Sequence, residues 1–424
     1  MASTRLSNPT RRVFLHEVAS LIGTATFGSA CIIEEPFPVP SARAITRGPK
    51  YHWFGYYDKL EFDPTDRYVL GNEVDFRGRP PEPTDAIRLG MVDLEAGDQW
   101  IELGQTTAWN WQQGAMLQWI PSTASQVVWN DRDGDNYVAR VLDVTDMSAG
   151  VRTLPMAIYC ISPDGRYAFC IDYKRIESVR FGYGYSGPPD PFADDLAPEG
   201  SGIWKMDMAT GETELIFSIA DAVRIPPLEG AWDPAIRHWV YHLLVSPDGK
   251  RLAFLHSIIG TDNLLSCRLL TIDTNGGTPR VVDPHGKTSH YDWRDPSHLL
   301  AWSRQPDPGY GFYLFTDGTG EVEHVGEGVM VSDGHCTYLA DERWILCDTY
   351  PDQNRNQHPY IFDAETEERY PLGEFNSPTD YTGEFRCDTH PRQSRDGRKV
   401  VIDSPHDGGR QMYLIDISSI LDSV

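Results

Sequence analysis

The sequence has few cysteines, few basic residues and no long hydrophobic run after residue 31. Its seven cysteines stand at scattered spacings, which excludes a disulfide framework; Cys160 and Cys170 flank one expected turn and could pair, with buried free thiols as the alternative. Lysine and arginine number 37 against 62 aspartates and glutamates, a formal charge of -25. This balance argues against nucleic acid as a partner, and against an anionic substrate unless a local basic pocket exists.

The first 35 residues are typical of an export signal. Residues 10–15 (TRRVFL) are close to the twin-arginine pattern, and small apolar residues follow as far as Cys31. This stretch is too short for a stable membrane span. Residues 28–31 (GSAC) resemble a lipoprotein cleavage site, so a lipid anchor at Cys31 is an open alternative, as is an accidental arginine pair on a tail. We expect export to the periplasm or cell surface, with the folded domain over residues 36–424.

What the sequence does contain is a repeat. Its 12 tryptophans and 20 tyrosines, with many glycine and proline turns, favour strands. Units of about 40 to 50 residues recur, each with several short apolar runs separated by polar turns, which is typical of propeller blades. Ser-Pro-Asp-Gly turns at 162–165 and 246–249 predict hairpins, because proline presets the first turn position and glycine takes the positive φ.

Seven such units follow residue 52, so we predict an all-β, seven-bladed β-propeller; a count of six or eight is the alternative. The seventh unit lacks an obvious fourth strand after Ile417. We therefore expect residues 44–47 to supply that strand and close the ring. One long insertion, residues 175–200, falls inside the third unit, and long loops inside compact repeats are often functional.

Histidines and amides recur at the unit starts. In a propeller the first strand of each blade lines the central channel, so these residues should converge at one mouth. The positions are His52, Asn110 or Gln113, Tyr159, His242, His290, His335 and His390.

A metal site is predicted on one side of this ring. His290, His335 and His390 start three consecutive units, and Cys387 shares a turn with His390. Imidazole and thiolate together suit Zn²⁺, which is commonly four-coordinate. Because protein would fill all four positions, we expect a structural zinc ion, with Mn²⁺ or Ca²⁺ as alternatives. A hydrogen-bonded histidine cluster without metal is the competing interpretation.

The histidine-led units, the Ser-Pro-Asp-Gly hairpins and the closing segments 388–391 and 412–416 resemble the oligogalacturonate lyases. They also resemble the related seven-bladed ulvan lyases and rhamnosyl-glucuronate lyases. The resemblance covers most of residues 50–417. In the oligogalacturonate lyases, the resemblance implies, the counterparts of His290 and His390 hold a catalytic metal. At that family's metal site, the position of Cys387 is a glutamine and the position of Arg392 is a further histidine. Ulvan-type relatives carry a structural zinc bound by histidine and cysteine.

The resemblance also implies β-elimination by a tyrosine and a histidine, with an arginine that neutralises the uronate carboxylate. Tyr185 matches the tyrosine by its place in the insertion. The expected arginine position holds Ser201 and Gly202, so Arg180 or Arg175 is the candidate substitute. The assigned catalytic residues are His52, Asn130, Tyr185 and His242, and the assigned substrate-binding residues are Asn110, Gln113, Arg180 and Arg392.

The sequence thus predicts an exported, monomeric polysaccharide lyase acting on acidic, uronate-containing oligosaccharides. Two alternatives stay open at this point. A non-catalytic propeller would bind glycans or proteins at the same mouth. A glycoside hydrolase would need paired carboxylates, for which Asp58, Asp131 and Asp292 near the unit starts are candidates.

Overall fold

The Ser-Pro-Asp-Gly segments form the predicted hairpin turns. At residues 162–165 the Ser162 hydroxyl donates to the Asp164 carboxylate (2.6 Å), and Gly165 has a φ of +73°. A Cβ atom on Gly165 would collide with the carbonyl oxygen of Pro121, so this turn requires glycine for its packing as well as its φ. The turn joins β10 (Cys160–Ile161) to β11 (Tyr167–Cys170) as an antiparallel pair.

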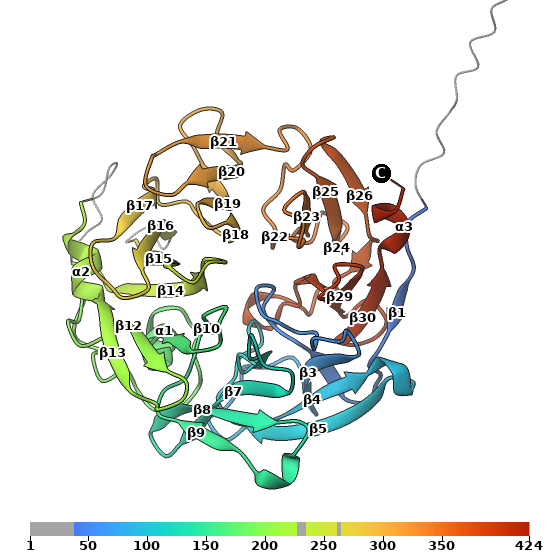
Figure 1. Cartoon of the computed structure of the whole chain (residues 1–424), viewed down its shortest axis with the longest axis horizontal. Helices are drawn as coiled ribbons and strands as arrows, with labels where there is room; N and C mark the ends of the chain where they lie inside the picture. Colours follow the sequence, from blue (N-terminus) through green and yellow to red (C-terminus); the bar gives the residue numbers. More distant parts are fainter. Residues whose placement is uncertain (1–37, 227–234, 261–263, 424) are drawn as a thin grey trace, which may run out of the picture. The chain divides into compact units, whose positions relative to one another are not determined.

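The computed structural model describes residues 38–226, 235–260 and 264–423, and arranges seven four-stranded antiparallel sheets around a central axis (Figure 1). This confirms the predicted seven-bladed β-propeller. The predicted export segment, residues 1–35 with Cys31, lies outside the described residues. Among the residues described, no helix has the length and apolar character needed to cross a bilayer.

Each blade runs from an inner strand at the channel to an outer strand at the rim. Blade 1 contains β2 (Tyr51–Trp53), β3 (Tyr68–Val74), β4 (Ile87–Asp93) and β5 (Gln99–Thr106). Blade 2 contains β6 (Gln118–Trp119), β7 (Gln126–Asp133), β8 (Asn136–Asp143) and β9 (Arg152–Leu154). Blade 3 contains β10, β11, β12 (Gly202–Asp207) and β13 (Thr213–Ser218). Blade 4 contains β14 (His238–Val245), β15 (Arg251–Ile259), β16 (Leu265–Asp273) and β17 (Arg280–Asp283). Blade 5 contains β18 (Tyr291–Asp295), β19 (His298–Arg304), β20 (Tyr310–Thr316) and β21 (Val322–Val325). Blade 6 contains β22 (Thr337–Tyr338), β23 (Trp344–Cys347), β25 (Tyr360–Asp363) and β26 (Glu368–Pro371).

Blade 7 closes the ring with strands from both ends of the described chain. It contains β28 (Arg392–Gln393), β29 (Lys399–Ser404), β30 (Gln411–Asp416) and β1 (Ala42–Ala44). In Figure 1, β1 (blue) runs beside β30 (red), with Ala42 opposite Ile415. An N-terminal closing strand was expected at residues 44–47, and it lies two residues earlier.

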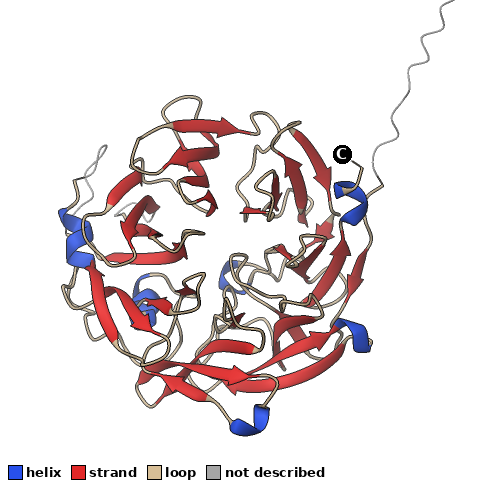
Figure 2. Cartoon of the chain, viewed as in Figure 1, coloured by secondary structure: helices blue, strands red, loops and turns tan. Residues whose placement is uncertain are grey.

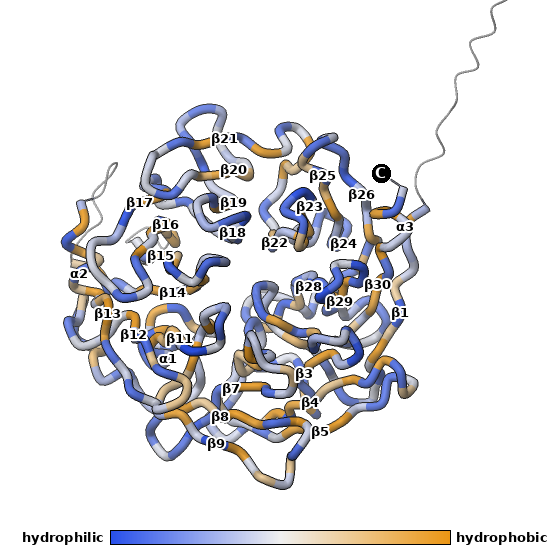
Figure 3. Tube along the Cα trace, viewed as in Figure 1, coloured by the Kyte–Doolittle hydropathy of each residue, from blue (hydrophilic) through white to orange (hydrophobic). Residues whose placement is uncertain are grey.

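Helices are few and short in the described chain (Figure 2), and hydrophobic residues concentrate along the strands (Figure 3). The small elements outside the blades are α1 (Tyr173–Val179), α2 (Ile219–Arg224), α3 (Ser418–Leu421), η1 (Leu94–Ala96), η2 (Met147–Ala149), η3 (Gly383–Phe385) and the ribbon of β24 (Asn356–Gln357) with β27 (Phe375–Asn376). The predicted insertion runs between β11 and β12, and α1 begins it. Asp172 caps α1 by accepting from the backbone N–H groups of Lys174 and Arg175.

Candidate metal centre and active site

Three buried side chains from blades 6 and 7 gather unsatisfied polar atoms in one place. His335 precedes β22, while Asp388 and His390 precede β28. One ligand atom of each lies within 4.8 Å of the other two. Within the described chain, Nε2 of His335, Oδ1 of Asp388 and Nε2 of His390 have no hydrogen-bond partner. Because buried polar atoms are normally paired, three such atoms together indicate a ligand. We call these residues the unsatisfied triad.

Asp348 fixes both histidines of the unsatisfied triad. Its Oδ1 bonds with Nδ1 of His335 (2.9 Å) and accepts from the backbone N–H of the same residue (2.8 Å). Its Oδ2 accepts from the backbone N–H of His390 (3.1 Å) and from the Thr389 hydroxyl (2.6 Å). A carboxylate on Nδ1 leaves the Nε2 lone pair of His335 for a metal ion. Two imidazoles and a carboxylate therefore fit a divalent transition metal.

Cys387, a predicted zinc ligand, does not belong to this group. Its side chain packs in an apolar cluster with Trp53, Trp111 and Phe385. Burial raises the pKa of its thiol to about 12, which keeps the thiol protonated. The next residue, Asp388, offers a candidate ligand atom instead. Three protein ligands would leave a coordination position open, which favours a catalytic role over the predicted closed, structural zinc site.

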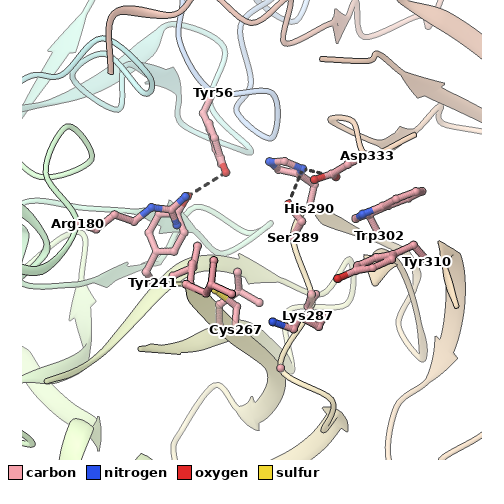
Figure 4. A pocket seen from close by; sticks show the side chains of 15 residues that line it. Tyr56, Arg180, Tyr241, Cys267, Lys287, Ser289, His290, Trp302, Tyr310 and Asp333 are labelled. Atoms are coloured by element: carbon pink, nitrogen blue, oxygen red, sulfur yellow. Dashed lines mark hydrogen bonds and ion pairs between the residues drawn. The ribbon is translucent and has the colours of Figure 1, made fainter. Parts of the chain in front are cut away.

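His290 lies beside the unsatisfied triad without joining it. Its ring centroid is 4.2 Å from that of His335. Its Nδ1 bonds with the Asp333 carboxylate (3.0 Å) and the Ser289 hydroxyl (3.1 Å). Figure 4 shows the other ring nitrogen on the opposite side of the imidazole, toward Tyr56. His290 thus offers a nitrogen to the cavity described below.

The insertion of blade 3 brings Tyr183 to the unsatisfied triad. Nε of Arg386 donates to Oδ2 of Asp388 (2.7 Å), and Nη2 of Arg386 donates to the Tyr183 hydroxyl. The guanidinium of Arg180 lies 4.0 Å from the Tyr183 ring centroid. Burial alone would raise the pKa of Tyr183, but the charges of Arg386 and Arg180 outweigh it and lower this pKa. A phenol in this environment is suited to act as a general base.

The sequence prediction missed Tyr183, Arg386 and Asp388, although two signals for them exist. Tyr183 stands two residues before Tyr185 in the same glycine-rich segment. Residues 386–390 read Arg-Cys-Asp-Thr-His, and an extended chain turns alternate residues to one side. That alternation groups residues 386, 388 and 390 and turns Cys387 away.

Tyr185 has the opposite environment. It is fully buried, its ring stacks on that of Tyr173 at 4.1 Å, and its hydroxyl accepts from Nδ2 of Asn130 (2.9 Å). Burial raises its pKa. Asn130 also bonds with both the N–H and the C=O of Ile158, each at 2.8 Å. These two predicted catalytic residues therefore join blades 2 and 3, and their assignment to catalysis does not fit the structure.

Asn110 and Gln113 also bond inside the protein, although Oε1 of Gln113 has no hydrogen-bond partner in the described chain. Nδ2 of Asn110 donates to the carbonyl oxygens of Tyr183 (3.1 Å) and Gly184 (3.2 Å). Nε2 of Gln113 donates to the Tyr159 hydroxyl (3.0 Å). Both residues lie in the loop that precedes β6, not in a strand. Neither contacts the cavity described below, so they hold the insertion and blade 3 rather than a substrate.

His52 and His242 lie apart from each other. His52 bonds with Gln411 (2.9 Å) and Glu73 (3.2 Å), and its ring meets the edge of Trp100. His242 occupies a bulge in β14 with a φ of +57°, and its Nε2 contacts the Tyr57 hydroxyl (3.2 Å). The structure therefore does not gather the five predicted pocket residues: His52, Asn110, Asn130, Tyr185 and His242.

Arg392 is a structural residue in blade 7. Its side chain is 1% exposed and bonds with the carboxylates of Glu61 (2.9 Å) and Asp403 (3.1 Å). It also donates to the carbonyl oxygen of Gly55. These contacts join β28 and β29 to the segment after β2, so the predicted substrate-binding role does not fit.

A cavity of about 350 Å³ lies beside the unsatisfied triad, and Figure 4 shows the side chains that line it. Its lining residues are Tyr56, Arg180, Tyr241, Leu255, Leu264, Leu265, Cys267, Gly286, Lys287, Thr288, Ser289, His290, Trp302, Tyr310 and Asp333. The Tyr56 ring lies 5.4 Å from that of His390, and Arg180 lies against Tyr183. Two residues that line the cavity, Tyr56 and Arg180, therefore also contact the unsatisfied triad and the candidate base. Of the assigned substrate-binding residues, Arg180 alone is among the lining residues.

No protein-family model matches the chain, and no curated protein matches it by sequence. Solved structures do match. An oligogalacturonate lyase from Vibrio parahaemolyticus has a TM-score of 0.64 at 17% identity, covering 89% of this chain and 95% of its own. An oligogalacturonate lyase in complex with manganese has a TM-score of 0.65 at 15% identity, covering 89% and 93%. The β-propeller domain of the Trilobed protease from Pyrococcus furiosus has a TM-score of 0.50 at 11% identity, covering 86% and 96%. At these identities the likeness establishes the propeller fold.

Proposed function

We propose that this protein is a metal-dependent polysaccharide lyase that cleaves uronate-containing oligosaccharides by β-elimination. The observation that carries the proposal is Tyr183, a tyrosine of lowered pKa held between Arg180 and Arg386 beside the unsatisfied triad. The likeness to two oligogalacturonate lyase structures, one in complex with manganese, supports the same reaction class. A lyase requires this combination of a base and clustered positive charge.

The residues of the site would divide the reaction between them. Elimination removes the proton from the carbon that carries the uronate carboxylate and expels the oxygen on the next carbon as a double bond forms. Arg180 faces the cavity and would pair with the carboxylate, which lowers the cost of the developing negative charge. The Tyr183 phenolate would take the proton and return it to the departing oxygen. The base then lies next to the cation that binds the carboxylate, as the chemistry requires.

A metal ion would be held by Nε2 of His335, Nε2 of His390 and the Asp388 carboxylate. When bound, it would supply positive charge that neutralises the uronate carboxylate. Arg386 joins Asp388 to Tyr183, so it would fix the candidate base relative to this ligand. His290, held by Asp333, would orient sugar hydroxyls in the cavity.

Export is part of the proposal. The twin-arginine-like segment at residues 10–15 supports a periplasmic or cell-surface enzyme, with a lipid anchor at Cys31 as the open alternative. We propose that it acts there as a monomer. Fractionation of cells that carry Arg11→Lys and Arg12→Lys together tests export: retention in the cytoplasm supports it, and unchanged location contradicts it.

The lyase proposal is tested by the ultraviolet absorbance of the unsaturated uronate that β-elimination creates. Oligogalacturonates and glucuronate-containing oligosaccharides would be incubated with the protein, with added Mn²⁺ or Zn²⁺ and with a chelator. We expect metal-dependent absorbance growth on at least one uronate substrate. Cleavage without new absorbance would indicate a hydrolase. Binding without cleavage would indicate a non-catalytic glycan-binding propeller.

A further inference from the structure

The wall of the cavity opposite Tyr183 has chemistry that the proposed elimination does not use. Figure 4 shows Arg180, Tyr56 and Tyr241 on one side and Lys287, Trp302 and Tyr310 on the other. The second group comes from blade 5 and from the chain that joins blade 4 to it. We call Lys287, Trp302 and Tyr310 the blade 5 wall.

Lys287 is a half-buried cation on the blade 5 wall that forms no ion pair with any residue of the described chain. Its backbone is fixed by a bridge to Cys267 in β16. Gly286 and Thr288 on either side bond with the backbone of Cys267 (3.0 and 3.1 Å). A cation that is partly desolvated, rigidly carried and unpaired is a ready partner for an anion.

The charge of the cavity is opposite to that of the whole protein. Its charged lining residues are Arg180, Lys287 and Asp333, and the Asp333 carboxylate is already engaged by His290. The chain as a whole has a formal charge of -25. Arg180 and Lys287 have no carboxylate partner within the described chain. In so acidic a protein, two such cations in one cavity favour an anionic ligand there. Their separation on opposite walls favours a ligand with two acidic groups.

Trp302 and Tyr310 give the same wall a flat apolar surface. They project from neighbouring strands β19 and β20, with ring centroids 6.3 Å apart and ring planes within 17° of parallel. Tyr310 is 58% exposed, so its ring is available to a ligand. The apolar C–H face of a pyranose ring packs well on such a surface, while its hydroxyl and acid groups point to the sides.

We propose that the blade 5 wall is a subsite for a second acidic sugar, adjoining the sugar that undergoes elimination. The ring of that sugar stacks on Tyr310, and its acid group, a uronate carboxylate or a sulfate ester, pairs with Lys287. The substrate is accordingly an oligosaccharide with acidic groups on two neighbouring units. This inference rests on the proposed function for the identity of the first unit, and on the blade 5 wall for the second.

Calorimetric binding to the Tyr183→Phe protein tests the subsite without turnover. The probes are trigalacturonate, galacturonate, a sulfated oligosaccharide of the carrageenan type and neutral maltotriose. We expect Lys287→Met and Tyr310→Ala each to weaken binding of an acidic oligosaccharide about tenfold or more, and to leave galacturonate binding unchanged. Whether trigalacturonate or the sulfated probe binds more tightly identifies the acid group. The matched control is Lys250→Met, which removes an exposed lysine paired with Asp248 in the β14–β15 turn.

Several results would overturn the subsite. Binding of neither acidic oligosaccharide, equal binding of maltotriose, or unchanged affinity in Lys287→Met would each do so. The two proposals fail separately. Lysine-dependent binding without any elimination keeps the subsite and rejects the lyase, whereas elimination with lysine-independent binding keeps the lyase and rejects the subsite. In an active protein, Lys287→Met should raise KM about tenfold with little change in kcat.

Discussion

Two buried polar regions of this propeller contain similar residues but differ in one respect. Between blades 2 and 3, the side-chain polar atoms of Asn110, Asn130 and Tyr185 all have hydrogen-bond partners. Between blades 6 and 7, the unsatisfied triad has three polar atoms without partners in the described chain. The first region joins blades, and the second has the capacity to bind a ligand. Between these two sets of residues, the presence or absence of hydrogen-bond partners for the buried polar atoms distinguishes residues that join blades from residues that could hold a ligand.

The two tyrosines of the insertion repeat this contrast two residues apart. Tyr185 stacks in the core, where burial raises its pKa. Burial acts on Tyr183 in the same direction, but Arg386 and Arg180 outweigh it and lower its pKa. Only Tyr183 adjoins the unsatisfied triad through Arg386.

The largest expected effect comes from exchanging these two hydroxyl groups for hydrogen. Tyr183→Phe removes the proposed base and should lower kcat about 100- to 10,000-fold, since that is the usual contribution of general base catalysis. Tyr185→Phe should leave kcat near that of the parent and cost about 1 kcal/mol of stability, because one buried hydrogen bond is lost. Turnover assays and urea unfolding measure the two effects. The reverse pattern would restore Tyr185 as the catalytic tyrosine.

Arg392→Met tests the structural side of the comparison. The substitution leaves the buried carboxylates of Glu61 and Asp403 without their cation, which should cost about 3 to 5 kcal/mol of unfolding free energy. The protein that remains folded should bind oligosaccharide with the affinity of the parent. A stable Arg392→Met protein that has lost substrate affinity would instead support the original substrate-binding assignment.

Asn130→Ala should have a smaller effect of the same kind. It removes two bonds to the backbone of Ile158 and one to Tyr185, so we expect a loss of about 3 kcal/mol in chemical denaturation. Activity per folded molecule should persist, because no atom of the cavity changes. If stability were retained while activity disappeared, Asn130 would have to be placed in the reaction.

The smallest expected effect is a shift in pH dependence. A base acts when deprotonated, so kcat/KM should rise with pH through the pKa of Tyr183. Arg180→Gln removes one of the cations that lower this pKa. The rising limb should therefore move to higher pH. A limb that stays in place would show that a group other than Tyr183 sets it.

The fold was predictable because it repeats. Turns such as residues 162–165 specify the hairpins, and the seven cycles of apolar runs specify the number of blades. Both signals are local in the sequence. The position of His335 and His390 ahead of β22 and β28 was predictable for the same reason. The sequence prediction assigned Cys387 and Tyr185, whereas the geometry favours Asp388 and Tyr183. Both choices depend on side-chain direction in segments between the blade strands, which the blade repeat does not determine.

Some partners were not predictable even in outline. Asp348 supports the unsatisfied triad from the end of β23, and Arg386 reaches Tyr183 across 203 positions of sequence. Nothing local in either segment specifies the other. Such pairings follow from closing the ring, which brings blades 3, 6 and 7 to the same end of the channel.

Metal content is the most direct measurement of the central claim, that the unsatisfied triad binds a divalent ion. Elemental analysis after metal-replete expression should find about one equivalent in the parent and in Cys387→Ser, whose thiol lies in the apolar cluster. Asp388→Asn, which exchanges a charged ligand for a neutral amide of the same shape, should fall to about a tenth of that. Absence of metal from the parent, or its loss in Cys387→Ser with retention in Asp388→Asn, would contradict the account.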